Sequence, residues 1–121
     1  MINSESKHVY DLEERTYIFA KRVRCFIKSL PQTLANYEDG KQVIRSSGSV
    51  GANYIEANEA LGKKDFIMRA KICRKESKES AYFLRLIIET NSSEIYKDGL
   101  DLCDEAKQLV KIFSAIIEKS K

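Results

Sequence analysis

Apolar residues recur along this chain at alternating steps of three and four positions, which is the spacing of a helix that buries one face. The first such stretch covers residues 9–30 and ends before Pro31, because a proline disfavours the helical conformation of the residue that precedes it. The second stretch begins near residues 36–39, where Asn and Asp can cap free amides, and runs to Leu61. Gly62 is placed as a helix-terminating glycine.

Two more helices follow with the same spacing. The third covers residues 63–90, and segment 91–93 breaks the pattern and caps a fourth helix that continues through Ile116. Short connections place consecutive helices side by side in opposite directions. The pattern therefore predicts an all-α fold, an antiparallel up-down-up-down four-helix bundle, as a single domain over residues 1–121. The predicted apolar seams consist of Leu12, Thr16, Phe19, Val23, Phe26 and Leu30; Val43, Ser47, Val50, Tyr54, Ala57 and Leu61; Phe66, Ala70, Cys73, Ser77, Leu84 and Ile88; and Ile95, Leu102, Ala106, Leu109, Phe113 and Ile116.

Two glycines lie inside the second predicted helix, where each costs about 1 kcal/mol relative to alanine. Gly48 and Gly51 fall beside Ser47 on one flank of the seam, so this flank has little side-chain bulk. The pattern favours a neighbouring helix that approaches this backbone closely. The same segment matches the G-x-x-G loop that clamps RNA in KH domains, but the strands and the basic residue of that loop are absent.

Positive charge is concentrated in the third predicted helix. The net charge of the chain is +3, yet residues 63–78 hold seven cations against two carboxylates, a local charge of +5. Six of the seven, together with Arg85, lie within about one third of the helix circumference and span roughly 30 Å. This row is a candidate nucleic-acid-binding surface, although a lysine-rich stripe is also the usual solvated face of a bundle. The residues of the basic row are Lys63, Lys64, Lys71, Arg74, Lys75, Lys78 and Arg85.

The third predicted helix also carries more apolar surface than one bundle seam requires. Four apolar residues lie beside the basic row, well away from the seam. A second apolar stripe indicates contact with another subunit, whereas the alternative is a wide core face or scattered exposed residues. We therefore predict a homo-oligomer. The candidate interface residues are Met68, Ile72, Phe83 and Leu86.

No catalytic or metal-binding constellation is present in the sequence. His8 is the only histidine, so neither a Ser/His/Asp set nor a di-metal bundle with its Glu-x-x-His motifs can be assembled. Arg45, Asn53 and Glu56 share the polar side of the second predicted helix, and we expect them to form a hydrogen-bonded network against a neighbouring helix. The sequence therefore predicts no enzyme, no cofactor and no metal.

Cysteine usage and hydropathy indicate the compartment. Cys25, Cys73 and Cys103 are odd in number and lack a paired spacing, as expected of small apolar residues in a reducing cytoplasm. No apolar run approaches the roughly 18 residues of a membrane span. The apolar core of a secretory signal is missing from the polar start, MINSESKHVYDLEER. We predict a cytoplasmic protein with no membrane partner.

Residues 44–88 resemble the signature of the bacterial four-helix-bundle family encoded in intervening sequences of 23S ribosomal RNA genes. The matching residues are Arg45-Ser46-Ser47, Ser49-Val50, Ala52-Asn53 and Glu56, followed by Lys63-Lys64-Asp65-Phe66. The chain departs from similar sequences at two places. Gly62 stands where they often have Ser or Thr, and Ala57-Asn58 stands where many have Gly just after the Glu of the second predicted helix. The resemblance extends more loosely over nearly the whole chain.

This resemblance implies an antiparallel four-helix bundle that assembles into a homopentameric ring. It implies no established enzymatic activity. Related accessory proteins of diversity-generating retroelements form similar pentamers and engage nucleic acid and a reverse transcriptase.

Two functions from different classes remain open. The first is a non-catalytic oligomeric protein that binds nucleic acid, with RNA favoured over DNA by the genomic setting of the family. Base specificity should be low, because Tyr82 is the only aromatic residue beside the basic row. The alternative is a protein-interaction scaffold whose basic face docks an acidic partner protein. Binding to arbitrary RNA separates the two, since a scaffold specific for one protein should ignore it.

Overall fold

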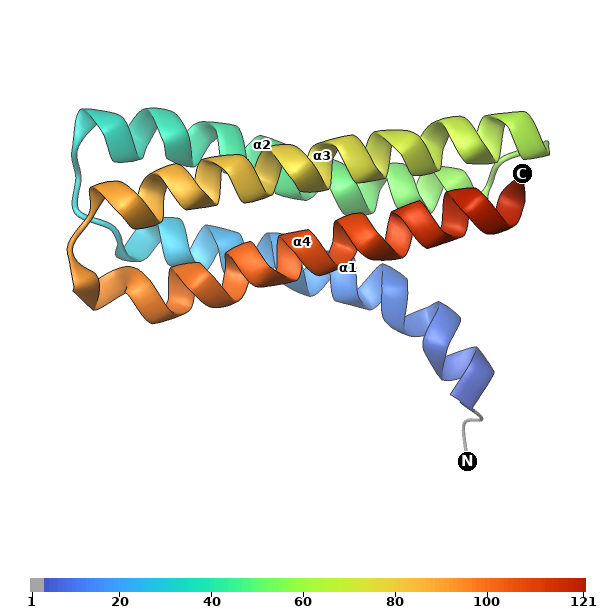
Figure 1. Ribbon diagram of the computed structural model, residues 1–121, viewed down its shortest axis with the longest axis horizontal. Helices are drawn as coiled ribbons and strands as arrows, with labels where there is room; N and C mark the ends of the chain where they lie inside the picture. The colour runs from blue at the N-terminus through green and yellow to red at the C-terminus, as the bar shows by residue number, and fades with distance from the viewer. Residues whose placement is uncertain (1–3) are drawn as a thin grey trace.

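The structure, a computed structural model, describes the backbone of residues 4–121 and the side chains of residues 12–121. Four helices and one short 3₁₀ helix follow one another, and no strand occurs among the described residues (Figure 1). The α1–α2 and α3–α4 connections lie at one end of the molecule and the α2–α3 connection lies at the other. The predicted all-α fold with four helices is confirmed. The elements are α1 (Ser4–Ser29), α2 (Leu34–Asn58), α3 (Lys63–Thr90), η1 (Ser93–Ile95) and α4 (Tyr96–Ser120).

The first turn follows from proline and threonine chemistry. α1 ends just before Pro31, as predicted from the restriction that proline places on its predecessor. The hydroxyl of Thr33 then accepts a hydrogen bond from the backbone amide of Asn36 at 3.1 Å, which caps α2. Because threonine supplies the cap, α2 begins at Leu34, ahead of the predicted start at residues 36–39.

The turn between α2 and α3 differs from the prediction. α2 ends at Asn58, and Leu61, the last residue of the predicted seam, is fully exposed. Gly62 does not terminate α2, because it is the N-cap residue of α3 and has an extended backbone with φ at −155°. Among the described residues no glycine has a positive φ. A terminating glycine acts through the left-handed conformation, and α2 ends without one.

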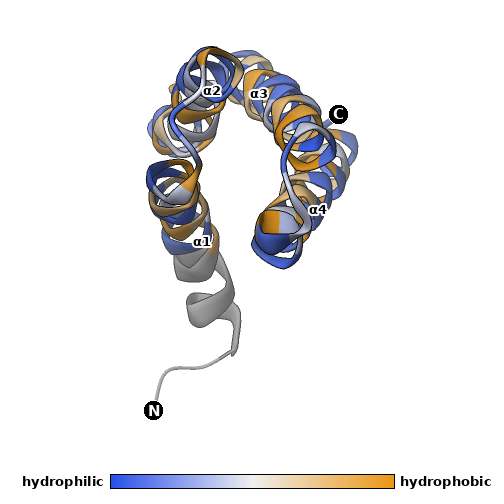
Figure 2. Ribbon diagram, turned by 90° about the vertical axis from the view of Figure 1, so that its left-hand side faces the viewer, coloured by the Kyte–Doolittle hydropathy of each residue, from blue (hydrophilic) through white to orange (hydrophobic). Residues whose placement is uncertain are grey.

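The predicted seams otherwise supply most of the core, although Phe66 of the third seam and Ile95 and Ile116 of the fourth are only half-buried. All seam positions of α1 from Thr16 onward are buried, and so are those of α2 up to Ala57. The rings of Tyr54 and Phe113 meet edge to face across the core, with centroids 5.7 Å apart, and join α2 to α4. Viewed along the bundle (Figure 2), the helices surround the core in sequence order, and α1 and α4 are the most widely separated neighbours.

α1 packs on the glycine flank of α2. A Cβ atom on Gly51 would lie 3.1 Å from Oγ1 of Thr16 and 3.7 Å from the backbone carbonyl carbon of that residue. A Cβ atom on Gly48 would lie 3.1 Å from Nη2 of Arg24. That guanidinium reaches over α2 and donates to the carbonyl oxygen of Ile44 at 3.3 Å. The predicted close approach to this flank is confirmed, and the approaching helix is α1.

Candidate nucleic-acid interface

The basic row lies on the outer side of α3. The opposite face of the helix, which includes Ala70, Cys73 and Leu84, is buried because α3 packs against both α2 and α4. This burial directs the row toward solvent. Arg74 is half-buried, and the other six cations of the row are exposed. The helical spacing thus brings all seven predicted residues to one accessible face.

Two carboxylates of α3, those of Glu76 and Glu79, are engaged by α2. Glu76 is only 6% exposed and accepts a hydrogen bond from Nη2 of Arg45 on α2 at 3.1 Å, and Glu79 pairs with the same guanidinium. These hydrogen bonds raise the pKa of Arg45 above its ordinary value. Within the row only Arg85 has an acidic partner, Glu89, at 2.9 Å along the same helix. The remaining six cations have no carboxylate of the described residues within ion-pair distance.

The polar residues predicted to form one network on α2 make separate contacts. Arg45 binds the two carboxylates of α3 described above. Two turns further along, Oδ1 of Asn53 accepts a hydrogen bond from Nη1 of Arg69 at 3.0 Å. Glu56 is exposed and has no side-chain hydrogen bond with any described residue. The sequence alone did not identify Glu76 as a partner of Arg45, because this pairing depends on how α2 is aligned with α3.

Small polar groups complete the contact between α2 and α3. The buried hydroxyls of Ser46 and Ser80 lie 2.7 Å apart. At the end of the pair of helices, the side-chain amides of Asn36 and Asn91 exchange two hydrogen bonds of 2.8 Å. Among the described residues, every buried polar side-chain atom has a partner. This side of α3 is therefore structural.

The second apolar stripe predicted for the third helix, called here the α3 stripe and made of Met68, Ile72, Phe83 and Leu86, is only partly accessible. Met68 is 44% exposed, whereas Ile72 and Leu86 are half-buried. Phe83 packs against the core and meets the ring of Tyr82 edge to face, with centroids 5.1 Å apart. Of the four predicted interface residues, Met68 therefore offers the most free apolar surface.

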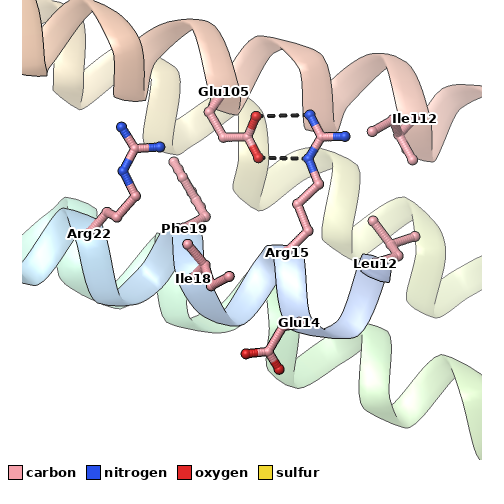
Figure 3. A pocket seen from close by; sticks show the side chains of 8 residues that line it. All are labelled: Leu12, Glu14, Arg15, Ile18, Phe19, Arg22, Glu105 and Ile112. Carbon is pink, nitrogen blue, oxygen red and sulfur yellow. Dashed lines mark hydrogen bonds and ion pairs between the residues drawn. The ribbon is translucent and has the colours of Figure 1, made fainter. Parts of the chain in front are cut away.

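A cavity of about 400 Å³ lies between α1 and α4 (Figure 3). The guanidinium of Arg15 donates to both carboxylate oxygens of Glu105, at 2.7 and 2.9 Å. This two-fold contact raises the pKa of Arg15 and holds the widely separated helices together. Apolar side chains of Leu12, Phe19 and Ile112 line much of the remaining wall. Both oxygens of the Glu105 carboxylate are therefore engaged by Arg15.

The two buried cysteines, Cys73 and Cys103, are not activated nucleophiles. Burial raises the pKa of the Cys73 thiol to about 12, and this thiol donates to the carbonyl oxygen of Val50 at 3.3 Å. Burial also raises the pKa of Cys103. Reactive cysteines have lowered pKa values, so neither thiol suits nucleophilic catalysis.

The described residues contain neither a metal-binding cluster nor a membrane-spanning helix. No cluster of three or more histidine, cysteine, aspartate or glutamate side chains among residues 12–121 could hold a metal ion, and His8 lies outside this range. No helix in the same part is long and apolar enough to cross a membrane.

The chain has relatives with known folds. The sequence model of the 23S rRNA-intervening sequence protein family matches residues 10–114. A similar crystal structure is that of a protein with unknown function from the S23 ribosomal protein family of Bacteroides thetaiotaomicron VPI-5482. The similarity covers 87% of this chain and 96% of that chain, with 29% sequence identity and a TM-score of 0.72. No functionally curated protein matches the chain.

Proposed function

The chain belongs to the 23S rRNA-intervening sequence protein family, and from this membership we propose that it is a non-catalytic, cytoplasmic homo-oligomer that binds nucleic acid through the basic row of α3. RNA is preferred to DNA in this proposal, because the name of the family refers to genes for 23S rRNA. The alternative is a scaffold that docks an acidic partner protein on the same row.

One observation carries the proposal: six cations of the row stand on an accessible face without an acidic partner among the described residues. Arg45 holds Glu76 and Glu79 on the α2 side of α3, so these carboxylates do not neutralise the row. Unpaired cations from Lys63 to Lys78, over roughly 22 Å, can replace the counterions of several phosphates of a nucleic acid strand. A merely solvated face usually interleaves both signs of charge.

Recognition in this proposal rests on phosphates. Tyr82 is an exposed aromatic residue beside the row, and one ring offers a stacking surface for a single base. Contacts to phosphate fix position and carry no sequence information. We therefore expect similar affinities for RNAs of different sequence.

Assembly multiplies the row. In this proposal the protomer is an antiparallel up-down-up-down bundle, and copies of it form a ring through the α3 stripe, with five as the favoured number. A ring presents several basic rows to one long RNA, so binding of the second row becomes intramolecular. Long RNA should therefore bind far more tightly than short RNA of the same composition.

The test is RNA binding by a variant with Lys71→Glu and Lys78→Glu, two exposed residues of the row without an acidic partner among the described residues. Six phosphate contacts on a single strand give a slope of log K against log[salt] of about −4, and losing two of them should flatten it to about −3. Affinity should fall by a similar factor for all sequences. The matched control, Lys119→Glu with Lys121→Glu, changes the charge equally at the end of α4 and should bind like wild type.

Two results would count against the proposal. RNA binding that is unchanged in the row variant would exclude the row as the site. A wild-type protein that ignores mixed-sequence RNA at low salt would instead favour the scaffold that docks an acidic protein.

A further inference from the structure

The surface where α3 meets α4 carries cations that the basic row does not include. The two helices pack side by side (Figure 2). The buried thiol of Cys103 on α4 donates to the carbonyl oxygen of Ala81 on α3 at 3.6 Å. Lys107 is exposed and lies one turn beyond Cys103, turned about 40° further from the core. Burial raises the pKa of the Cys103 thiol, and the charges of Lys107 and Arg85 oppose this shift, so a cation of each helix lies near the thiol.

Two contacts show how α4 is aligned along α3. Cys103 meets Ala81, as described above. Nearer the start of α4, a Cβ atom on Gly99 would lie 2.6 Å from Cγ1 of Ile88. As α4 advances along the chain, its partner on α3 therefore moves back. The outer residues of α4 that follow Cys103 lie beside the residues of α3 that precede Ala81.

This alignment places cations of the two helices at the same level. Counted from the Cys103 contact at equal rise per residue, Lys107 comes level with Lys78 and Lys111 with Arg74, to about one residue. Lys107 and Lys111 are both exposed, and neither has a carboxylate of the described residues within ion-pair distance. These two lysines, called here the α4 track, form a second and shorter line of cations beside the basic row.

Acidic groups on the same side of α4 leave the track positive. Glu118 is held by the ammonium of Lys121 at 3.0 Å. Asp104 accepts a hydrogen bond from Nε2 of Gln108 at 2.9 Å, and because this partner is neutral the carboxylate keeps its charge. Asp104 lies about 10 Å before Lys111 along the helix. The face is therefore most positive near Lys111 and less so toward the start of α4.

Two lines of cations suit a ligand with two lines of phosphates. Packed helices lie about 8–10 Å apart, which is comparable with the width of a groove in a double helix, about 6–12 Å in B-form DNA. A duplex has one row of phosphates on each side of such a groove, and these phosphates are ordered before binding. A single strand must instead be ordered on binding, and proteins that bind single strands commonly offset this cost by stacking bases on aromatic side chains. Segments 71–78 and 107–111, which carry the level cations, contain no aromatic residue.

We propose that the ligand of this face is double-stranded RNA, with phosphates of one strand on the basic row and phosphates of the other strand on the α4 track. The inference rests on the proposed function and adds to it the class of RNA and two contact residues, Lys107 and Lys111. Recognition of this kind reads the shape of the duplex and not its sequence.

The first experiment compares RNA ligands by fluorescence anisotropy over a range of salt concentrations. The wild-type protein should bind a duplex of about 20 base pairs roughly tenfold or more tightly than a single strand of the same length and mixed sequence at low salt. The salt slope should also be steeper for the duplex, since each contact contributes about −0.9 in a B-form duplex and about −0.7 in a single strand. Duplex DNA of the same sequence is a second arm, and tighter binding to it than to duplex RNA would overturn the assignment to RNA.

The second experiment changes the α4 track. Lys107→Glu with Lys111→Glu should weaken duplex binding about tenfold or more and flatten its salt slope by about 2. Binding of the single strand should change by no more than about twofold, because the basic row alone can hold one strand. The neutral variant, Lys107→Gln with Lys111→Gln, should show a smaller loss of the same kind.

The matched control lies on another side of the molecule. Lys21→Glu with Lys28→Glu changes two exposed lysines of α1, which line a cavity between α1 and α2 and also have no acidic partner among the described residues. This variant should bind duplex RNA like wild type. Circular dichroism and light scattering check that every variant keeps the fold and the mass of the wild-type protein.

The outcomes separate this inference from the proposed function. A preference for duplex RNA that is lost in the α4-track variant supports the inference. Single strands bound as tightly as duplexes, or duplex binding that survives the change of the track, would overturn it and leave RNA binding by the basic row intact. A wild-type protein that binds neither form of RNA overturns the proposed function and the inference together.

Discussion

The contact of α1 with the glycine flank of α2 leads to a prediction about two neighbouring glycines. Valine at position 51 places two methyl groups next to a Cβ that already lies 3.1 Å from Oγ1 and 3.4 Å from Cβ of Thr16. Thr16 is 1% exposed and its own hydroxyl donates to the carbonyl oxygen of Glu13, so its side chain cannot shift without disturbing this hydrogen bond. Valine has essentially one χ1 rotamer in a helix, so it cannot turn away.

The same substitution at position 48 meets a different neighbour. A Cβ there touches only the end of the flexible Arg24 side chain, which can move toward solvent. Overpacking at Gly51→Val should cost about 1–3 kcal/mol of unfolding free energy. Gly48→Val should change it by no more than about 0.5 kcal/mol, because better helix propensity offsets the displaced Arg24.

Urea unfolding followed by far-UV circular dichroism measures both values. The protein concentration is held constant and the mass is checked, since assembly contributes to apparent stability. The two melting temperatures should differ by several degrees. Equal effects at the two positions, or a more stable Gly51→Val variant, would show that α1 does not constrain this flank.

Two further predictions follow from burial. Met68→Glu introduces a charge at the most exposed position of the α3 stripe. Light scattering should give a smaller mass for this variant than for the wild-type oligomer of 13.9 kDa protomers, whereas the unfolding free energy should be nearly unchanged. An unaltered mass would show that Met68 is not part of the interface. Alkylation at pH 8–9 should modify Cys25 alone in the folded protein and Cys73 only after unfolding, because the Cys73 thiol is buried and, with a pKa of about 12, stays protonated. Mass spectrometry of folded and urea-treated protein identifies the modified cysteines. Rapid modification of Cys73 in the folded protein would contradict this prediction.

The helices and their buried faces could be predicted because they depend on local periodicity. The spacing of Phe19, Val23 and Phe26 already determines that they share one face, whatever α1 packs against. Helix boundaries depend on a closer competition between residues that can cap or end a helix. Thr33 caps α2 ahead of Asn36, and α2 ends before Gly62. The periodicity of apolar residues predicts neither boundary.

The candidate site was predictable only in part, for a related reason. The angular position of each cation on α3 follows from its residue number alone, so the basic row could be placed without a structure. Its lack of acidic partners could not, because that depends on how α2 is aligned with α3. Arg45 must lie next to Glu76 and Glu79 to form ion pairs with them, so that these carboxylates do not pair with cations of the row. Likewise, the α4 track comes level with the row only through the alignment of α4 with α3.

The alignment of α2 with α3 has two consequences, one for stability and one for the surface charge of α3. Arg45 satisfies Glu76, whose carboxylate would otherwise be buried without a partner at a cost of about 1–3 kcal/mol. The same contact binds two negative charges on the side of α3 that faces α2 and leaves six of the seven cations of the basic row without an acidic partner among the described residues. If these two glutamates paired with lysines of the row instead, the outer surface would be less positive by two charges. The binding surface of α3 is therefore determined by the packing of α2 as much as by the lysines themselves.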